Sequence, residues 1–189
     1  SSTDARSITH EGEISADGGQ IIISSDAYDS ALQSAINTTG MIDVSISGNG
    51  DGGNIQILAA NGSIEQSGVI QANAGSNGDG GEILIIADQN LKSSGQLQAK
   101  GGTDSGDGGF IETSAHVADI NQVRVDTRAA NGETGTWLID PDHYVINDSG
   151  SGSAADTSYM STSSIATNLG TTDVDVVSDL DGQMEVCPS

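Results

Sequence analysis

Short apolar segments recur along the chain, and most of them follow a pair of glycines. They read QIIISS, NIQILA, EILIIA, FIETSA and TWLIDP. In each segment the second and fourth residues are apolar or small, and a period of two places both on the same face of a β-strand. These inward positions are Ile21 and Ile23, Ile55 and Ile57, Ile83 and Ile85, Ile111 and Thr113, and Trp137 and Ile139. The pattern predicts five strands that each bury one face.

The strands belong to an internal repeat. The tetrapeptide Gly-Asp-Gly-Gly begins at Gly50, Gly78 and Gly106, at a spacing of 28 residues, and a related Ala-Asp-Gly-Gly begins at Ala16. Two further strand families keep nearly the same spacing, the first with Ile42, Ile70, Leu97 and Val125 and a weaker one with Ile64 and Leu91. Each repeat therefore contains three short strands separated by turn residues.

This period predicts an all-β fold, a parallel β-helix or β-solenoid, with about 28 residues and three strands per coil. Equivalent side chains of successive coils would stack about 4.8 Å apart. The Asp-Gly-Gly corners would supply backbone angles that residues with a Cβ resist. An antiparallel β-sandwich is the alternative, but such a fold has no reason to repeat at this spacing.

Two segments interrupt the strand pattern. Asp29–Ile36 and Ser161–Gly170 have apolar residues at helical spacing, and both precede an alternating strand, so each is expected to be a short helix inserted into a coil. The resulting division is a β-helix repeat shaft over residues 1–146 and, over 147–189, a loop followed by a further helix-strand coil of the same solenoid.

Charge excludes several classes of partner. The 189 residues contain 5 Lys and Arg against 27 Asp and Glu, a formal net charge of −22. Nucleic-acid binding needs basic patches, and docking on anionic membranes needs them too. No segment approaches the ~20 apolar residues of a membrane helix. The single cysteine, Cys187, cannot form a disulfide within the chain.

One long segment carries a family resemblance. The run GGFIETSAHVADI…VDTRAANGETGTWLIDPDHYVI, residues 108–146, resembles the filamentous-haemagglutinin-like adhesins, which are large exoproteins of Gram-negative two-partner secretion systems. The Gly-Asp-Gly-Gly repeats upstream of it look like the series that precedes this segment in that family. The secretion domain with its Asn-Pro-Asn-Gly-Ile type motif is absent from this sequence.

The resemblance implies a right-handed parallel β-helix that is secreted, lies at the bacterial cell surface and acts in adhesion, aggregation or biofilm formation. It also implies that an outer-membrane transporter secretes the parent protein. Partners would be copies of the chain itself or components of host or matrix surfaces. The family motif marks architecture and assigns no catalytic residue.

Candidate chemistry is sparse. Asp17, Asp51, Asp79 and Asp107 fall at equivalent corners, and a stack of carboxylates would favour a bound Ca²⁺; the alternative is that each makes a local turn hydrogen bond. No other cofactor is expected.

Histidines and acids near the end of the shaft are candidate acid–base groups. Asp140, Asp142 and His143 are expected to form a turn with His143 exposed, and His116 is expected to be a corner residue rather than a base. Arg124 and Arg128 are expected to pair with nearby surface acids.

The sequence is therefore compatible with three functions. The first is a non-enzymatic, stiff acidic rod within an adhesin. The second is a subunit of an extracellular filament joined end to end by β-strand stacking. A carbohydrate-active β-helix enzyme is the third, and the shortage of basic residues disfavours it.

Overall fold

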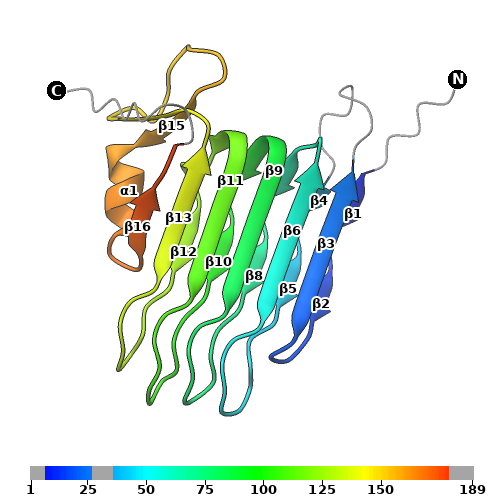
Figure 1. Ribbon diagram of the computed structural model, residues 1–189, viewed down its shortest axis with the longest axis vertical. Coiled ribbons are helices and arrows are strands. Elements are labelled where there is room, and N and C mark those ends of the chain that lie inside the picture. Colours follow the sequence, from blue (N-terminus) through cyan, green and yellow to red (C-terminus); the bar gives the residue numbers. More distant parts are fainter. Residues whose placement is uncertain (1–6, 27–35, 179–189) are drawn as a thin grey trace, which may run out of the picture.

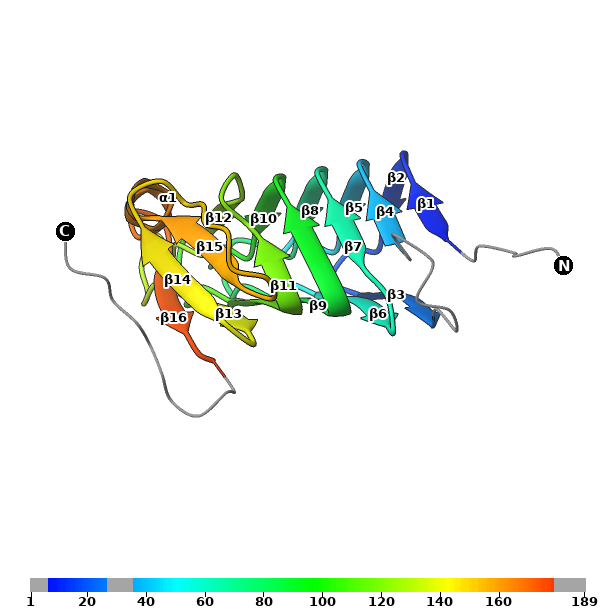
Figure 2. The same ribbon diagram turned by 90° about the horizontal axis from the view of Figure 1, so that it is seen from above.

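The chain winds into a parallel β-solenoid. The computed structural model describes residues 7–26 and 36–178. All of its strand pairs are parallel, and Asn54 of one coil lies beside Glu82 of the next, which confirms the predicted repeat of 28 residues. The coils follow one another from β1 at one end to β16 and the helix α1 at the other (Figures 1 and 2).

Three strand families build the coils. The longest forms one side of the solenoid, with β3 (Gln20–Asp26), β6 (Asn54–Ala60), β9 (Glu82–Ser93), β11 (Phe110–Asp119), β13 (Thr136–Pro141) and β16 (Asp173–Val176). A second family contains β1 (Ile8–His10), β4 (Ile36–Thr38) and β7 (Ile64–Gln66). The third forms a separate sheet with β2 (Glu13–Ser15), β5 (Met41–Asp43), β8 (Val69–Gln71), β10 (Gln96–Gln98) and β12 (Arg124–Asp126).

The prediction of three separate strands per coil holds for the coils that begin at β3 and β6. In the next two coils the first two strands are continuous, so β9 and β11 each turn from the long side into the second side. The register of β9 against β11 shifts between Ala115 and Val117, where this turn is made.

A ladder of apolar side chains fills the interior. Ile55, Ile83, Ile111 and Trp137 lie in register on successive coils, and each has no exposed surface. A second inward column, two residues further along each strand, contains Ile57, Ile85, Thr113 and Ile139. Because β-branched residues pack well on a pleated surface, this sequence fills the core with few large aromatic residues, Trp137 and Tyr144.

The glycine corners work differently from the prediction. The left-handed backbone angles occur at Gly50, Gly78 and Gly106, the glycine before each aspartate, with φ of 136°, 149° and 110°. The paired glycines that follow these three aspartates have no such angles, whereas the first corner matches the prediction, with a φ of 61° at Gly18. A Cβ on Gly53 or Gly81 would instead collide with the carbonyl oxygen of the matching glycine one coil earlier. The paired glycines are therefore required by close approach of the coils.

The last coil departs from the repeat. β14 (Tyr144–Asn147) and β15 (Ser158–Ser161) pair with each other, α1 spans Thr162–Asn168, and β16 adds to β13 in the long sheet. The predicted helix in Ser161–Gly170 is thus confirmed, with Ser161 as its N-cap. The other predicted helix, Asp29–Ile36, lies outside the described residues except for Ile36.

Helix α1 covers the edge of the third sheet. Asn168, which is 1% exposed, accepts a hydrogen bond from the backbone N–H of Val125 in β12 at 2.9 Å and donates one to the carbonyl of Val123 at 3.3 Å. The backbone N–H of Thr127 donates to the carbonyl of Thr171 in the same way. These bonds satisfy groups of β12 that a further strand would otherwise pair with.

Candidate functional site

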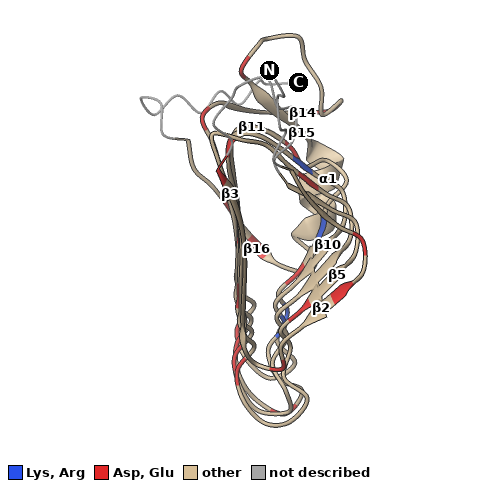
Figure 3. Ribbon diagram, turned by 90° about the vertical axis from the view of Figure 1, so that its right-hand side faces the viewer, with Lys and Arg blue, Asp and Glu red and all other residues tan. Residues whose placement is uncertain are grey.

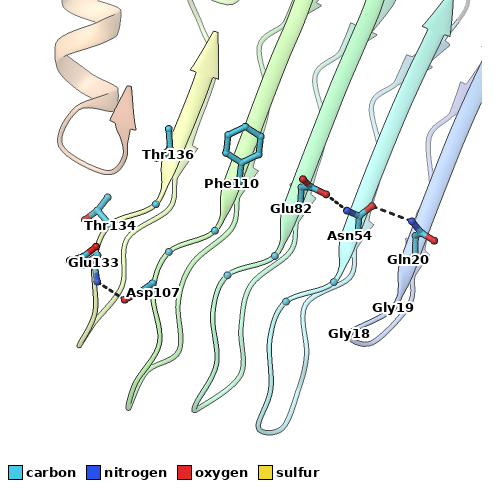
Figure 4. Close-up of a pocket in the computed structure, with 17 residues that line it drawn as sticks. Gly18, Gly19, Gln20, Asn54, Glu82, Asp107, Phe110, Glu133, Thr134 and Thr136 are labelled. Atoms are coloured by element: carbon cyan, nitrogen blue, oxygen red, sulfur yellow. Dashed lines mark hydrogen bonds between the residues drawn. The ribbon is translucent and has the colours of Figure 1, made fainter. Parts of the chain in front are cut away.

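An open groove runs along the glycine corners. It has a volume of about 890 Å³ and is lined by the paired glycines together with Asn54, Glu82, Asp107, Phe110 and Glu133 (Figure 4). The groove crosses five successive coils at the start of the long strands, so the same positions of each repeat line it.

Aspartates at the corners form a hydrogen-bonded column. Asp51 accepts a bond from the backbone N–H of Asp79 at 2.9 Å, Asp79 accepts one from Asp107 at 2.8 Å, and Asp107 accepts one from Glu133 at 2.8 Å. Each carboxylate therefore ties its coil to the next one. These hydrogen bonds run between coils. The alternative to a calcium site predicts instead that each aspartate makes a hydrogen bond within its own turn.

Asp17 does not belong to this column. Its carboxylate accepts bonds from the backbone N–H and the hydroxyl of Ser47, at 2.8 and 3.1 Å. The reason is the length of the corner: residues 16–19 connect β2 to β3, whereas the longer segment 44–53 connects β5 to β6. The prediction that four aspartates occupy equivalent corners is wrong for Asp17.

In the part of the chain that the structure describes, no three His, Cys, Asp or Glu side chains are grouped so that they could hold a metal ion. Calcium at Asp17, Asp51, Asp79 and Asp107 stays a prediction. Unfolding followed with and without calcium, at matched ionic strength, would test it.

A second cluster forms around His116. Its Nδ1 lies 2.5 Å from a carboxylate oxygen of Asp142, and its Nε2 lies 3.4 Å from one of Asp156. His116 belongs to β11, Asp142 to the turn between β13 and β14, and Asp156 to the loop before β15. The imidazole thus connects three segments that are distant in the sequence.

The two carboxylates favour the protonated imidazole. The hydrogen bond to Asp142 is the main cause that raises the pKa of His116 above its usual 6.5; burial opposes the rise, and Asp156 adds to it. The side chains are partly exposed, with 37% of the surface of His116 and 71% of that of Asp156 open to solvent. The cluster is therefore a surface ion pair, which stabilises only modestly.

Beside His116 lies an open hollow of about 560 Å³, lined by Ser114, Asp88, Asp140 and the apolar side chain of Ile86 among others. The Ser114 hydroxyl donates to Glu112 at 2.6 Å rather than to the imidazole. Ser114 and His116 therefore do not form the serine–histidine pair of an activated nucleophile.

The predictions for this region were partly right. His143 is exposed on a bend, as expected. The pairing of His116 with Asp142 was missed, although a signal existed. The coil from Phe110 to Thr136 is 26 residues long instead of 28, and this spacing places Asp142 beside His116.

The predictions for the two arginines and the cysteine compare differently with the structure. Arg128 pairs with Asp126 at 2.7 Å, which confirms one expected ion pair. The prediction for Arg124 is wrong, because its guanidinium donates to the backbone carbonyls of Gln122 and Val123. Cys187 lies outside the described residues.

Comparisons with known protein families, curated proteins and solved structures found no match for this chain. Among the described helices, none is long and apolar enough to cross a membrane.

Proposed function

We propose that this chain is a non-enzymatic, structural segment of a large secreted bacterial surface protein. It acts as a stiff, acidic β-helical rod in adhesion, aggregation or biofilm formation. The parent protein leaves the cell through an outer-membrane transporter, and the rod contacts other copies or host and matrix surfaces. The sequence resemblance of residues 108–146 supports this assignment.

The observation that carries the proposal is the unbroken stack of coils. The column Ile55, Ile83, Ile111 and Trp137 is fully buried, and parallel ladders join successive coils in the long sheet from β3 to β16 and in the third sheet from β2 to β12. Bending such a stack would break apolar contacts and the hydrogen bonds between coils at the same time, so the stack resists bending. A stack of this kind suits a spacer that holds a binding region away from a surface.

The alternative of an end-to-end filament is disfavoured by α1. A second subunit would extend the third sheet by adding a strand to β12, but Asn168 and Thr171 already bond to the backbone groups of this edge. Electron microscopy of the purified protein tests this point. Short single rods would support the proposed rod, and long filaments would support the end-to-end filament.

Adhesion is tested with beads coated with the purified chain and offered to cultured cells and to matrix-coated wells. The matched control is the variant Ile83→Asp, which places a charge in the fully buried ladder and unfolds the stack. Beads with the wild-type chain should adhere and the control beads should not. Equal adhesion of both would contradict a role of the folded rod.

Two further measurements separate the other functions. Cations should screen the charge of −22 and promote bundling of rods, seen as increased light scattering. Cleavage of acidic polysaccharides by the purified chain would favour the enzyme and would count against the proposal.

A further inference from the structure

The outer face of the long sheet carries an apolar stripe. Ile21 and Ile23 point inward, so the alternate residues of the same strands point outward. A solvated face would be polar at these positions, but six of them are large and apolar. They are Ile22, Leu58, Leu84, Ile86, Phe110 and Leu138, and we refer to them as the outer stripe.

The stripe extends across five neighbouring strands, with Gln56 and Glu112 between some of its members. Leu58 lies directly beside Ile86, and Leu84 and Leu138 lie on either side of Glu112 in the same column. Ile22 is 54% exposed, and the other five are half-buried by their neighbours. Figure 1 looks onto this face, where β3, β6, β9, β11 and β13 lie side by side. Apolar surface gathered in this way is typical of a contact surface.

Apart from His116, which pairs with Asp142 and Asp156, the described charged residues around the stripe are acidic. Acidic side chains stand at outward positions of the same strands or at their ends: Asp26, Glu82, Asp88, Glu112, Asp140, Asp142, Asp173 and Asp175. The described basic residues lie elsewhere, with Lys92 paired to Glu65 and Arg128 paired to Asp126. Figure 3 shows Lys and Arg on the side of β10 and α1 and none on the long sheet.

This charge pattern indicates which kind of partner can bind the outer stripe. A second copy of the chain, also carrying −22, would bring two acidic faces together. The chain's own residues 179–189 contain three acids and no Lys or Arg, so they are repelled as well. A partner whose apolar side chains alternate with Lys or Arg matches both the stripe and the carboxylates around it.

We propose that the outer stripe is a binding surface for a cationic, amphipathic polypeptide segment. Its apolar side chains would cover Leu84, Phe110 and Leu138, and its basic side chains would pair with the surrounding carboxylates. Burial of apolar surface supplies the affinity, and the field of the acids raises the association rate. A spacer rod needs no ligand on its flank, so this inference goes beyond the proposed function and can fail without it.

The test measures binding of a fluorescent twelve-residue peptide of alternating Lys and Leu by anisotropy. The variant Leu84→Ser/Leu138→Ser removes two residues of the stripe. Its matched control, Met41→Ser/Val69→Ser, changes two half-buried apolar residues that face outward on the third sheet. The stripe variant should bind roughly tenfold more weakly, and the control should bind like the wild type. An all-Lys peptide of equal charge should bind roughly tenfold more weakly to the wild type.

Equal binding of the peptide to both variants would overturn the proposal, and so would equal binding of the two peptides, since charge alone would then explain the affinity. A dimer of the free protein that the stripe variant dissociates would show a second copy as occupant and would overturn it too. If the stripe variant fails to fold, a photo-crosslinking form of the peptide is used with the wild-type protein to locate the binding surface. Crosslinks on β9, β11 and β13 support the proposal, and crosslinks elsewhere contradict it.

Discussion

The indole Nε1–H of Trp137 donates a 3.0 Å hydrogen bond to the hydroxyl of Thr113 inside the coil stack. Trp137 takes the place that isoleucine occupies in the four preceding coils, and Thr113 takes the place of Ile85 in the next column. The indole introduces a buried N–H donor, and the neighbouring column has a threonine at this level, whose hydroxyl accepts the hydrogen bond. Both residues are fully buried, so the pair closes the isoleucine ladder with no unsatisfied polar group on the indole.

Replacing Thr113 by valine should destabilise the protein by about 1–3 kcal/mol, because the shape is kept and the indole N–H loses its partner. In a Trp137→Phe background the same change should cost far less, since no donor remains. Urea unfolding of the four proteins gives the coupling energy of the pair. Additive costs would show that the bond contributes little.

A Cβ at Gly81 has no room in the stack. Gly81→Ala should cost at least about 2 kcal/mol, because the methyl group would meet the carbonyl of Gly53 one coil below and would push the coils apart. Gly48→Ala is the matched control, since nothing lies within 4 Å of its Cβ. Thermal unfolding of both variants checks the difference. Similar melting temperatures would mean that the corners yield easily.

Asn168 supplies the side-chain acceptor for the backbone N–H of Val125 in β12. Asn168→Ala leaves the backbone N–H of Val125 without its acceptor and should destabilise the last coil by about 1–3 kcal/mol. Thr167→Ala, at an exposed position on the same helix, should have little effect. Hydrogen exchange at Val125 reports on the bond directly, and unchanged protection in Asn168→Ala would argue against a capping role.

The stacking of the coils follows from the sequence because one period governs it. Ile55, Ile83 and Ile111 recur at 28 residues, and only stacked parallel coils keep such residues together. Deviations from the period were harder to predict. The short corner at Asp17 and the short coil before Trp137 each shift a side chain to a new neighbour. The outer stripe does not follow from the alternation for another reason: a strand that buries one face is expected to present polar residues on the other, and Leu84 and Leu138 do not fit that expectation.

The pairing of His116 with Asp142 makes the last coil sensitive to pH. The pKa of His116 in the folded protein is raised above its unfolded value, mainly by the hydrogen bond to Asp142. The stabilisation is therefore complete below the unfolded value of about 6.5 and is lost as the pH rises through the raised pKa. Because the pair is partly exposed, its contribution should be below about 1 kcal/mol.

The comparison of wild type with His116→Asn measures this contribution. The melting temperature of the wild type should exceed that of the variant at about pH 5.5, and the difference should shrink by about pH 8.5. Hydrogen exchange in residues 148–157 should rise over the same interval, because Asp156 ties this loop to the imidazole. A difference in melting temperature that grows with pH would reverse the predicted sign, and His116 would then be stabilised as the neutral form.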